Sequence, residues 1–525
     1  MQSPIRYLTY SNAPARSKSL KPLVILSTIA LSPLWVCAAG SSGTFAVSSS
    51  PAAGASSSTA NADKIKSLIA QLGQGLKGDS SNAINALAKI GAPAVPYLEP
   101  LVERDDYHLA NDAEIALGLI GPAATQALIS ALRNTYTVQA AATDLGIIWA
   151  RNSYGALGDY AWSERTRATA TASIPKNLIP SLIAAFDDPA RESLGHDDGA
   201  RMYILEALSR IGVVSPEVIR VFEYTLFSKS LGFKSMTVLS LLPLTVHSKE
   251  MERLYERAVK AGYFDRDVAV RFIGPDADDL WNALTPPVQR QTTRGLLNIF
   301  ETSYDEPVSI AGKALLRVNP RVAVASIDIY LRWIKAENFR YRDNLVQTVG
   351  EMCRFQPDNP ERFYDAVIPT LLAFLDSKSE KPMPRAITRT TDEILGVSRR
   401  ASLYRETYVA IKNHAARGKL SERQRNQLVE AMSRRIKPPN PYRDNAIEIL
   451  GFLGHSARSI VPLLMTQYDK ETEGRVRKEI IIALGNIGDA RAIPKLREIL
   501  RLRDPDSEEH RHAEQALRKI QTGNG

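Results

Sequence analysis

The sequence predicts an all-α fold, an α-solenoid in which antiparallel helical hairpins stack side by side. Three observations predict it: an apolar helical pattern that recurs along the chain, a glycine that ends most copies, and a proline near the start of the next helix. The stretch LGNIGDARAIPKLREIL at 484–500 contains all three. Glycine and proline weaken a helix interior, so their places in this pattern mark the turn between two helices.

Residues 1–39 have the composition of an export signal or membrane anchor. Basic residues precede the apolar run LVILSTIALSPLWVCAA at 23–39, which ends in small residues. This order is typical of an exported protein, and the run is short for a stable transmembrane helix. We therefore expect an exported chain, either in the periplasm or anchored to a membrane at the cell envelope.

Cys37 leaves the form of the mature chain open. The stretch LWVC at 34–37 is similar to a lipobox, in which a lipidated cysteine becomes the first mature residue, but Val36 is bulkier than the usual small residue. Ordinary cleavage near Ala38 or Ala39, lipidation of Cys37 and an uncleaved anchor are the three alternatives. The chain has two cysteines, which excludes a disulfide framework or a cysteine-based zinc module.

The segment at 40–62 is rich in Ser, Ala and Gly and predicts a flexible tether, because it is too polar to form a core. The repeated pattern begins after it. Its copies share a Leu and an Ile or Leu three positions on, which places both large residues on one helix face, and in five of the six a small residue directly follows the first Leu. They are INALAKIG (84–91), EIALGLIG (114–121), ILEALSRIG (204–212), IEILGFLG (447–454), IIALGNIG (481–488) and EQALRKIQ (514–521).

Glycine ends five of these six copies, where it predicts a helix C-cap with left-handed backbone. The five glycines are Gly91, Gly121, Gly212, Gly454 and Gly488. Weaker copies in the middle of the chain place Gly274, Asn319 and Cys353 at the same position. A β-branched residue, a proline and, two positions on, a Leu recur at 94–98, 178–182, 367–371, 460–464 and 492–496, and the proline predicts the early part of the following helix.

This combination resembles HEAT repeats, especially the short bacterial kind also called PBS-lyase HEAT-like repeats. The resemblance is specific at 84–131, 204–220 and 446–521, and it implies an armadillo-type superhelix whose concave face binds partners. It implies no single activity. We expect HEAT-like repeats at 63–220 with an insertion at 150–176, degenerate repeats at 221–440, and HEAT-like repeats again at 441–525.

Basic residues are concentrated in one part of the chain. Residues 385–445 hold fourteen Lys and Arg against six Asp and Glu. One interpretation is a basic patch for an anionic partner; the other is the solvated face of long helices. The binding residues of such a patch would be Arg399, Arg400, Arg434 and Arg435. An acidic protein or an anionic membrane surface could bind there, and export argues against nucleic acid.

A second set of cations follows the shared Leu by two residues in four copies, at Lys89, Arg210, Arg317 and Lys519. Each complements the negative end of its helix dipole, and together they could also form a basic ladder. The insertion offers Tyr154, Tyr160 and Trp162 as an aromatic binding anchor, although an exposed linker explains them equally well.

No spacing in the sequence predicts catalytic residues, a metal site or a cofactor. The sequence therefore favours a non-catalytic exported scaffold for protein–protein interaction at the cell envelope. Two alternatives remain. The first is a lyase-related HEAT-like enzyme or enzyme partner. The second is a membrane-surface protein held by a lipid at Cys37 and by the basic patch.

Overall fold

The computed structural model describes residues 54–74, 80–151, 172–189, 197–228, 233–336, 338–376 and 391–523. The chain divides into two compact units, Met1–Thr59 and Ala60–Gly525, and the fold below is that of the second unit. Every regular element in the described ranges is a helix, which confirms the predicted all-α class.

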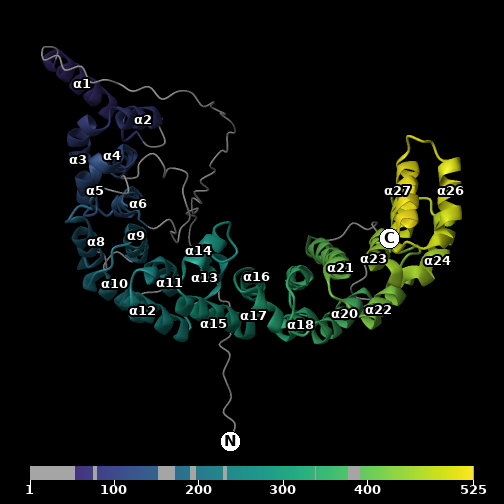
Figure 1. Cartoon of the computed structure of the whole chain (residues 1–525). Helices are drawn as coiled ribbons and strands as arrows, with labels where there is room; N and C mark the ends of the chain where they lie inside the picture. Colours follow the sequence, from purple (N-terminus) through teal and green to yellow (C-terminus); the bar gives the residue numbers. More distant parts are fainter. Residues whose placement is uncertain are drawn as a thin grey trace, which may run out of the picture. The chain divides into compact units, whose positions relative to one another are not determined.

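The helices form two rows along the chain (Figure 1). The first row consists of α2 (Ser81–Ile90), α4 (Tyr107–Ile120), α6 (Val138–Ile148), α9 (Asp197–Ile211), α11 (Lys234–Leu241), α13 (Arg266–Val270), α16 (Glu306–Val318), α19 (Arg342–Glu351), α21 (Thr391–Arg417), α23 (Arg443–Leu453), α25 (Gly474–Ile487) and α27 (Glu508–Thr522). The second row consists of α3 (Val95–Val102), α5 (Thr125–Ala131), α8 (Leu178–Phe186), α10 (Pro216–Phe227), α12 (Lys249–Lys260), α15 (Pro286–Thr302), α18 (Ile327–Lys335), α20 (Pro360–Asp376), α22 (Glu422–Ser433), α24 (Val461–Lys470) and α26 (Ile493–Leu502).

The contacts between these helices are those of stacked hairpins. Each first-row helix packs against the next one in its row, from α2 through to α27. Second-row helices do the same from α3 to α15 and from α18 to α22, and pairs such as α5 with α6 and α26 with α27 join the rows. Three helices stand outside this scheme: α1 (Gly54–Ile69), α14 (Ala277–Ala283) and α17 (Pro320–Ala325). The predicted α-solenoid is therefore confirmed, and the pattern continues through the part of the sequence where the repeat is degenerate.

The five strong glycine turns have the positive φ that the sequence predicted, although ψ at Gly91, Gly121 and Gly454 is between −142° and −130°, outside the left-handed helical region. All five glycines have positive φ, between 55° and 81°, a region that residues with a Cβ rarely adopt. Gly488 is fully left-handed, at φ 71° and ψ 23°, and its N–H bonds to the Leu484 carbonyl. Asp489 then accepts a hydrogen bond from the Arg491 N–H, and Pro494 lies in the first turn of α26.

All three weaker turns differ from the prediction, and Cys353 lies within a short 3-10 helix, Met352–Arg354, that follows α19. Gly274 lacks a positive φ and lies beyond the end of α13, in a turn before α14. Asn319 ends α16 at φ −142° and its side chain accepts a hydrogen bond from the Val322 N–H. Because α17 starts at the very next residue, Asn319 caps the start of that helix instead of turning left-handed.

One connected set of buried residues forms the core from Ile65 to Leu517. The shared Leu is buried in all six copies: Leu87, Leu117, Leu208, Leu450, Leu484 and Leu517. The small residue after it lets the next helix approach, as predicted. A Cβ added at Gly485 would lie 2.7 Å from the Ala516 Cα, and one at Gly451 would lie 3.1 Å from the Ala483 Cα.

Many polar contacts between neighbouring hairpins join residues 30–35 positions apart, which is the length of one repeat, and around α13 to α16 the separation is about 40. Asn134 Nδ2 donates to the Val102 carbonyl at 2.8 Å, and Trp333 Nε1 donates to the Phe300 carbonyl at 2.7 Å. The separation rises to 58 residues where Arg423 pairs with Asp365. The unit that contains α21 is therefore longer than its neighbours.

Two helical stretches of the described chain, Tyr107–Ala131 and Arg443–Lys470, are apolar and long enough to cross a membrane by length and composition. Each contains a glycine turn, at Gly121 and Gly454, between a first-row and a second-row helix. The apolar window of the first stretch is 67% buried. Both stretches have the composition that the stacked core requires.

Candidate binding sites

The structure separates the four arginines of the predicted basic patch. Arg435 is buried, pairs with Asp376 at the end of α20, and donates to the Ala431 carbonyl. Arg434 is exposed and pairs with Glu430 one helical turn earlier, at 3.4 Å. Arg399 and Arg400 belong to α21, but their side chains lie outside the described residues. An anionic partner at this surface stays a prediction, and Arg435 has a structural role.

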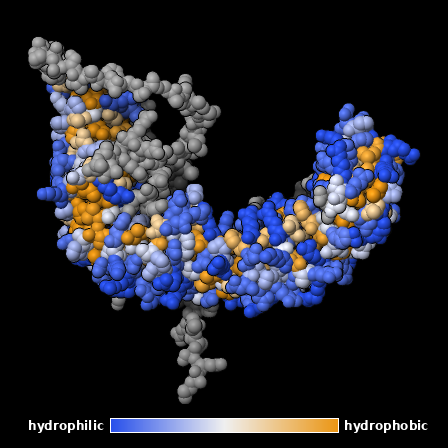
Figure 2. Space-filling model, viewed as in Figure 1, coloured by the Kyte–Doolittle hydropathy of each residue, from blue (hydrophilic) through white to orange (hydrophobic). Residues whose placement is uncertain are grey.

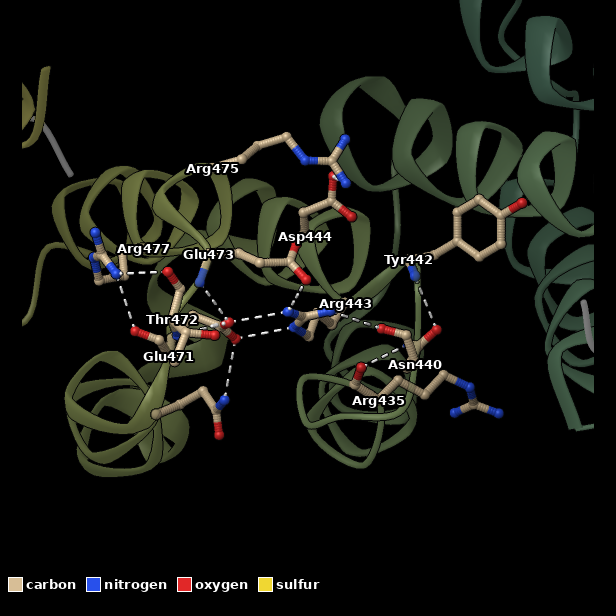
Figure 3. A network of polar contacts seen from close by, with 11 residues as sticks. Arg435, Asn440, Tyr442, Arg443, Asp444, Glu471, Thr472, Glu473, Arg475 and Arg477 are labelled. Carbon is tan, nitrogen blue, oxygen red and sulfur yellow. Dashed lines mark hydrogen bonds and ion pairs between the residues drawn. The ribbon is translucent and has the colours of Figure 1, made fainter. Parts of the chain in front are cut away.

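Other polar residues of the basic segment hold neighbouring units together (Figure 3). The buried Arg443 donates from Nε and Nη2 to the two carboxylate oxygens of Glu471, both at 2.9 Å, and also pairs with Glu473 at 2.7 Å. These hydrogen bonds lower the pKa of Glu471 to about 2. Asn440 donates to the Arg435 carbonyl at 2.7 Å. This network fixes the start of α23 to the loop between α24 and α25.

The tyrosines of the basic segment belong to the core. Tyr408 is fully buried, accepts a hydrogen bond from Asn440 Nδ2 at 3.1 Å, and lies beside Tyr404 and Tyr442 at ring distances of 5.4 and 5.7 Å. Such rings have no face left on which a base or lipid could stack.

Three cations of the proposed ladder bond within the protein. Arg317 pairs with Asp278 and also donates to carbonyls of the preceding unit, including that of Gly274 at 2.6 Å. Lys519 donates to Asn486 at 2.6 Å, and Arg210 pairs with Glu206 at 2.8 Å. These bonds favour the structural interpretation. The remaining predicted site residues, Cys37, Tyr154, Tyr160 and Trp162, lie outside the described residues.

The strongest candidate site is a pocket that the sequence did not predict. It has a volume of about 630 Å³ and is lined by residues of α4, α6, α9 and the loop before α6. Tyr107 and Tyr136 lie at its mouth, about half exposed, with ring centroids 5.8 Å apart. Figure 2 shows hydrophobic residues over the N-terminal part of the solenoid, among the helices from α3 to α10.

Two carboxyl groups line the pocket, from Glu114 on α4 and Asp144 on α6. Glu114 is 1% exposed, and its Oε1 has no hydrogen-bond partner among the described residues. Burial, together with the Asp144 carboxyl beside it, raises the pKa of Glu114 well above its ordinary value. Burial also raises the pKa of Asp144 to about 7. Desolvation and the proximity of a like charge both make the doubly ionised pair unfavourable, so the pair retains a proton near neutral pH.

Both acids occupy positions that are apolar in most other copies of the repeat; the last copy has an exposed acid, Glu514, at the position of Glu114. Glu114 lies three residues before the shared Leu, where four other copies have the buried residues Ile84, Leu205, Ile447 and Ile481. Asp144 lies directly before Leu145 of α6, where other copies place a buried Ala or Ile such as Ala116, Ala207, Ile449, Ala483 and Ala516. A carboxyl at a core position is costly unless it has a partner or a use.

The packing position next to Asp144 is also altered. Gly146, Gly451 and Gly485 each lie against an alanine of the next first-row helix, whereas Gly118 lies against Asp144. A Cβ at Gly118 would be 1.5 Å from Asp144 Oδ2, so the carboxylate occupies the space that a side chain at position 118 would need. Comparison of copies position by position was the signal in the sequence that could have found this site.

The described chain is thus a repeat solenoid with one acidic pocket between adjacent units. Residues 426–518 match the family model of HEAT repeats, so this part of the chain consists of HEAT repeats, as the sequence pattern indicated. The family model extends from α22 to α27 and therefore leaves the pocket outside its bounds.

Several solved structures are similar to the chain. The crystal structure of Kap121p is 13% identical over 89% of this chain and 49% of that chain, with a TM-score of 0.42. Kap121p bound to Nup53p is 12% identical over 89% of this chain and 45% of that chain, with a TM-score of 0.41. A designed armadillo repeat protein is 15% identical over 49% of this chain and 99% of its own length, with a TM-score of 0.28. The chain spans about half the length of Kap121p. No curated protein matches the chain.

Proposed function

We propose that this protein is a non-catalytic scaffold that binds another protein, with the pocket between α4, α6 and α9 as one point of contact. The pocket itself is the observation that carries the proposal. It forms only where successive units pack together, and exposed tyrosines surround its mouth. Tyrosine is enriched at protein interfaces because it combines a large apolar ring with a polar end.

The composition of the pocket supports a binding role over a catalytic one. Its lining residues include no Ser, Cys, Lys or His, so Glu114 and Asp144, which could transfer a proton, have none of these common nucleophiles beside them in the pocket. They instead combine aromatic rings, aliphatic side chains and the amides of Asn111 and Gln139. This mixture is typical of sites that hold a partner by shape and a few polar contacts.

Site-specific photocrosslinking in the native host tests the proposal. A photoreactive phenylalanine analogue replaces Tyr107 or Tyr136 in turn, with Leu502, an exposed residue at the end of α26, as the control position. We expect the same protein to be crosslinked from both pocket positions and not from position 502. No crosslinked protein from either pocket position, or identical products from all three, would contradict the proposal.

The setting of this scaffold is a second part of the proposal. We propose that the chain is exported and acts at the cell envelope, on the basis of the basic and apolar order of residues 1–39. The mass of the mature N-terminus, with labelling by a fatty-acid analogue, distinguishes cleavage near Ala39 from lipidation of Cys37. A full-length chain recovered from the cytoplasm would refute export.

A further inference from the structure

The pocket between α4, α6 and α9 carries at most one uncompensated negative charge, because its two acids together retain a proton near neutral pH. Two of its lining residues are the acids Glu114 and Asp144, and its lining contains no Lys, Arg or His. Glu114 Oε1 is fully buried and accepts no hydrogen bond from any described residue. An acceptor in this state costs free energy for as long as it lacks a donor. A cationic donor from outside the pocket would satisfy the acceptor and balance the charge together.

We propose that the pocket receives an arginine side chain of the partner protein, with the guanidinium bound between Glu114 and Asp144. The proposal rests on the proposed function, because it specifies what the scaffold recognises at this pocket. A guanidinium carries five N–H donors in one plane and can bond to several carboxylate oxygens at once. Lysine offers a compact and strongly hydrated charge, which is a poorer match to two adjacent acids.

The rest of the pocket fits the other parts of an arginine. Tyr107, Tyr136 and Tyr203 supply ring faces, on which a guanidinium stacks favourably. Ile115, Leu119 and Ile147 supply apolar surface for the methylene groups. The polar end of the ligand would thus reach the acids while its stem contacts apolar side chains.

Gly118 determines where the Asp144 carboxylate can lie. The closest atom to a Cβ built at Gly118 is Asp144 Oδ2, at 1.5 Å. A side chain at position 118 would therefore displace this carboxylate. Glu114 lies one helical turn before Gly118 on α4, so both residues are on the same helix face. Because Gly118 leaves room there for the Asp144 carboxylate, the two acids lie on the same side of the α4–α6 contact.

Binding of peptide pools to the purified chain tests the proposal. Four pools of biotinylated heptapeptides have arginine, lysine, citrulline or glutamate at the centre and mixed Ala, Ser, Tyr and Leu elsewhere. Citrulline is the neutral isostere of arginine, so the comparison isolates the charge. We expect the arginine pool to be captured at least tenfold more than the citrulline pool, with lysine between them. Equal capture of arginine and citrulline pools would refute the proposal.

Substitutions of single acids distinguish arginine binding in the pocket from nonspecific electrostatic attraction of cationic peptides to the protein. Asp144→Asn and Glu114→Gln keep the shape of the pocket and should abolish the preference for arginine, whereas Asp105→Asn, an exposed acid outside the pocket, should retain it. Thermal unfolding verifies that each variant folds. Undiminished preference for arginine in Asp144→Asn would overturn the assignment.

The outcome also distinguishes failure of this proposal from failure of the proposed function. If the crosslinked partner from position 107 persists unchanged in Asp144→Asn, the scaffold stands and the arginine contact is wrong. If no protein crosslinks at the pocket at all, the proposed function itself fails. If the crosslink is lost in Asp144→Asn and retained in Asp105→Asn, both proposals are supported.

Discussion

His414 is a buried titratable residue that serves the core. It lies on α21 against the rings of Phe363 and Tyr364, with centroid distances of 6.0 and 5.5 Å. Burial lowers its pKa to about 4, because the charged imidazolium loses its hydration there. The folded protein therefore keeps His414 neutral at pH values where an exposed histidine is protonated.

Because the pKa of His414 is lower in the folded than in the unfolded chain, the protein should lose stability in acid, and a substitution at His414 should reduce that loss. Between pH 6.5 and 4 the unfolded chain binds a proton at position 414 and the folded chain does not, so stability falls as the pH falls. The loss between pH 7 and pH 4.5 is about 2 kcal/mol for this group. The free energy of unfolding of His414→Phe, measured with urea, should therefore fall by about 2 kcal/mol less than that of the unmodified chain between pH 7 and pH 4.5. The control His512→Phe, on a largely exposed face of α27, should behave as the unmodified chain. A pH dependence unchanged in His414→Phe would contradict the assignment.

At the scale of the element, the residues at turns and at helix contacts show which features the sequence predicts and which it does not. The strong copies predicted their glycine turns and buried Leu correctly, because each follows from local backbone geometry and one helix face. Asn319 was assigned the wrong conformation because the start of the next helix competes for the same residue. The acid pocket was missed because Glu114 and Gly118 both lie inside a segment that matched the repeat. Only contact with α6 shows what they do.

The contact between α25 and α27 gives a matched test of helix approach. Gly485→Ala should destabilise the protein by about 1–3 kcal/mol, because the added Cβ would lie 2.7 Å from the Ala516 backbone. Gly474→Ala, at the first residue of the same helix, has its nearest neighbour at 3.8 Å and should be neutral or slightly stabilising. Chemical denaturation measures both. Equal effects of the two changes would show that the approach of α27 is not what requires glycine at 485.

At the scale of the whole molecule, the contacts are short-range in sequence. Hydrogen bonds and ion pairs between units join each hairpin to the next one, as Arg477 joins Glu509 at 2.8 Å and Arg257 joins Glu223 at 2.6 Å. In a stack of this kind stability is close to a sum of unit and nearest-neighbour contributions. Distant units are therefore coupled only through those between them.

This organisation predicts that damage at one end stays local. Leu517→Ala, in the last helix of the described chain, removes a buried side chain and should cost the terminal unit about 2–5 kcal/mol. Hydrogen exchange followed by mass spectrometry should show faster exchange in α25–α27 and unchanged exchange in α2–α6. Acceleration of similar size along the entire chain would indicate one cooperative unit and contradict the prediction.

The buried bidentate pair of Arg443 and Glu471 has a consequence for a chain under tension. If the two ends of the protein are pulled apart, units held by apolar contacts and exposed ion pairs should separate at low force, whereas the α23–α25 junction must break two buried charge-assisted bonds in the same step. A single-molecule extension trace should therefore show a series of small releases and one distinctly stronger event, which Glu471→Gln should weaken.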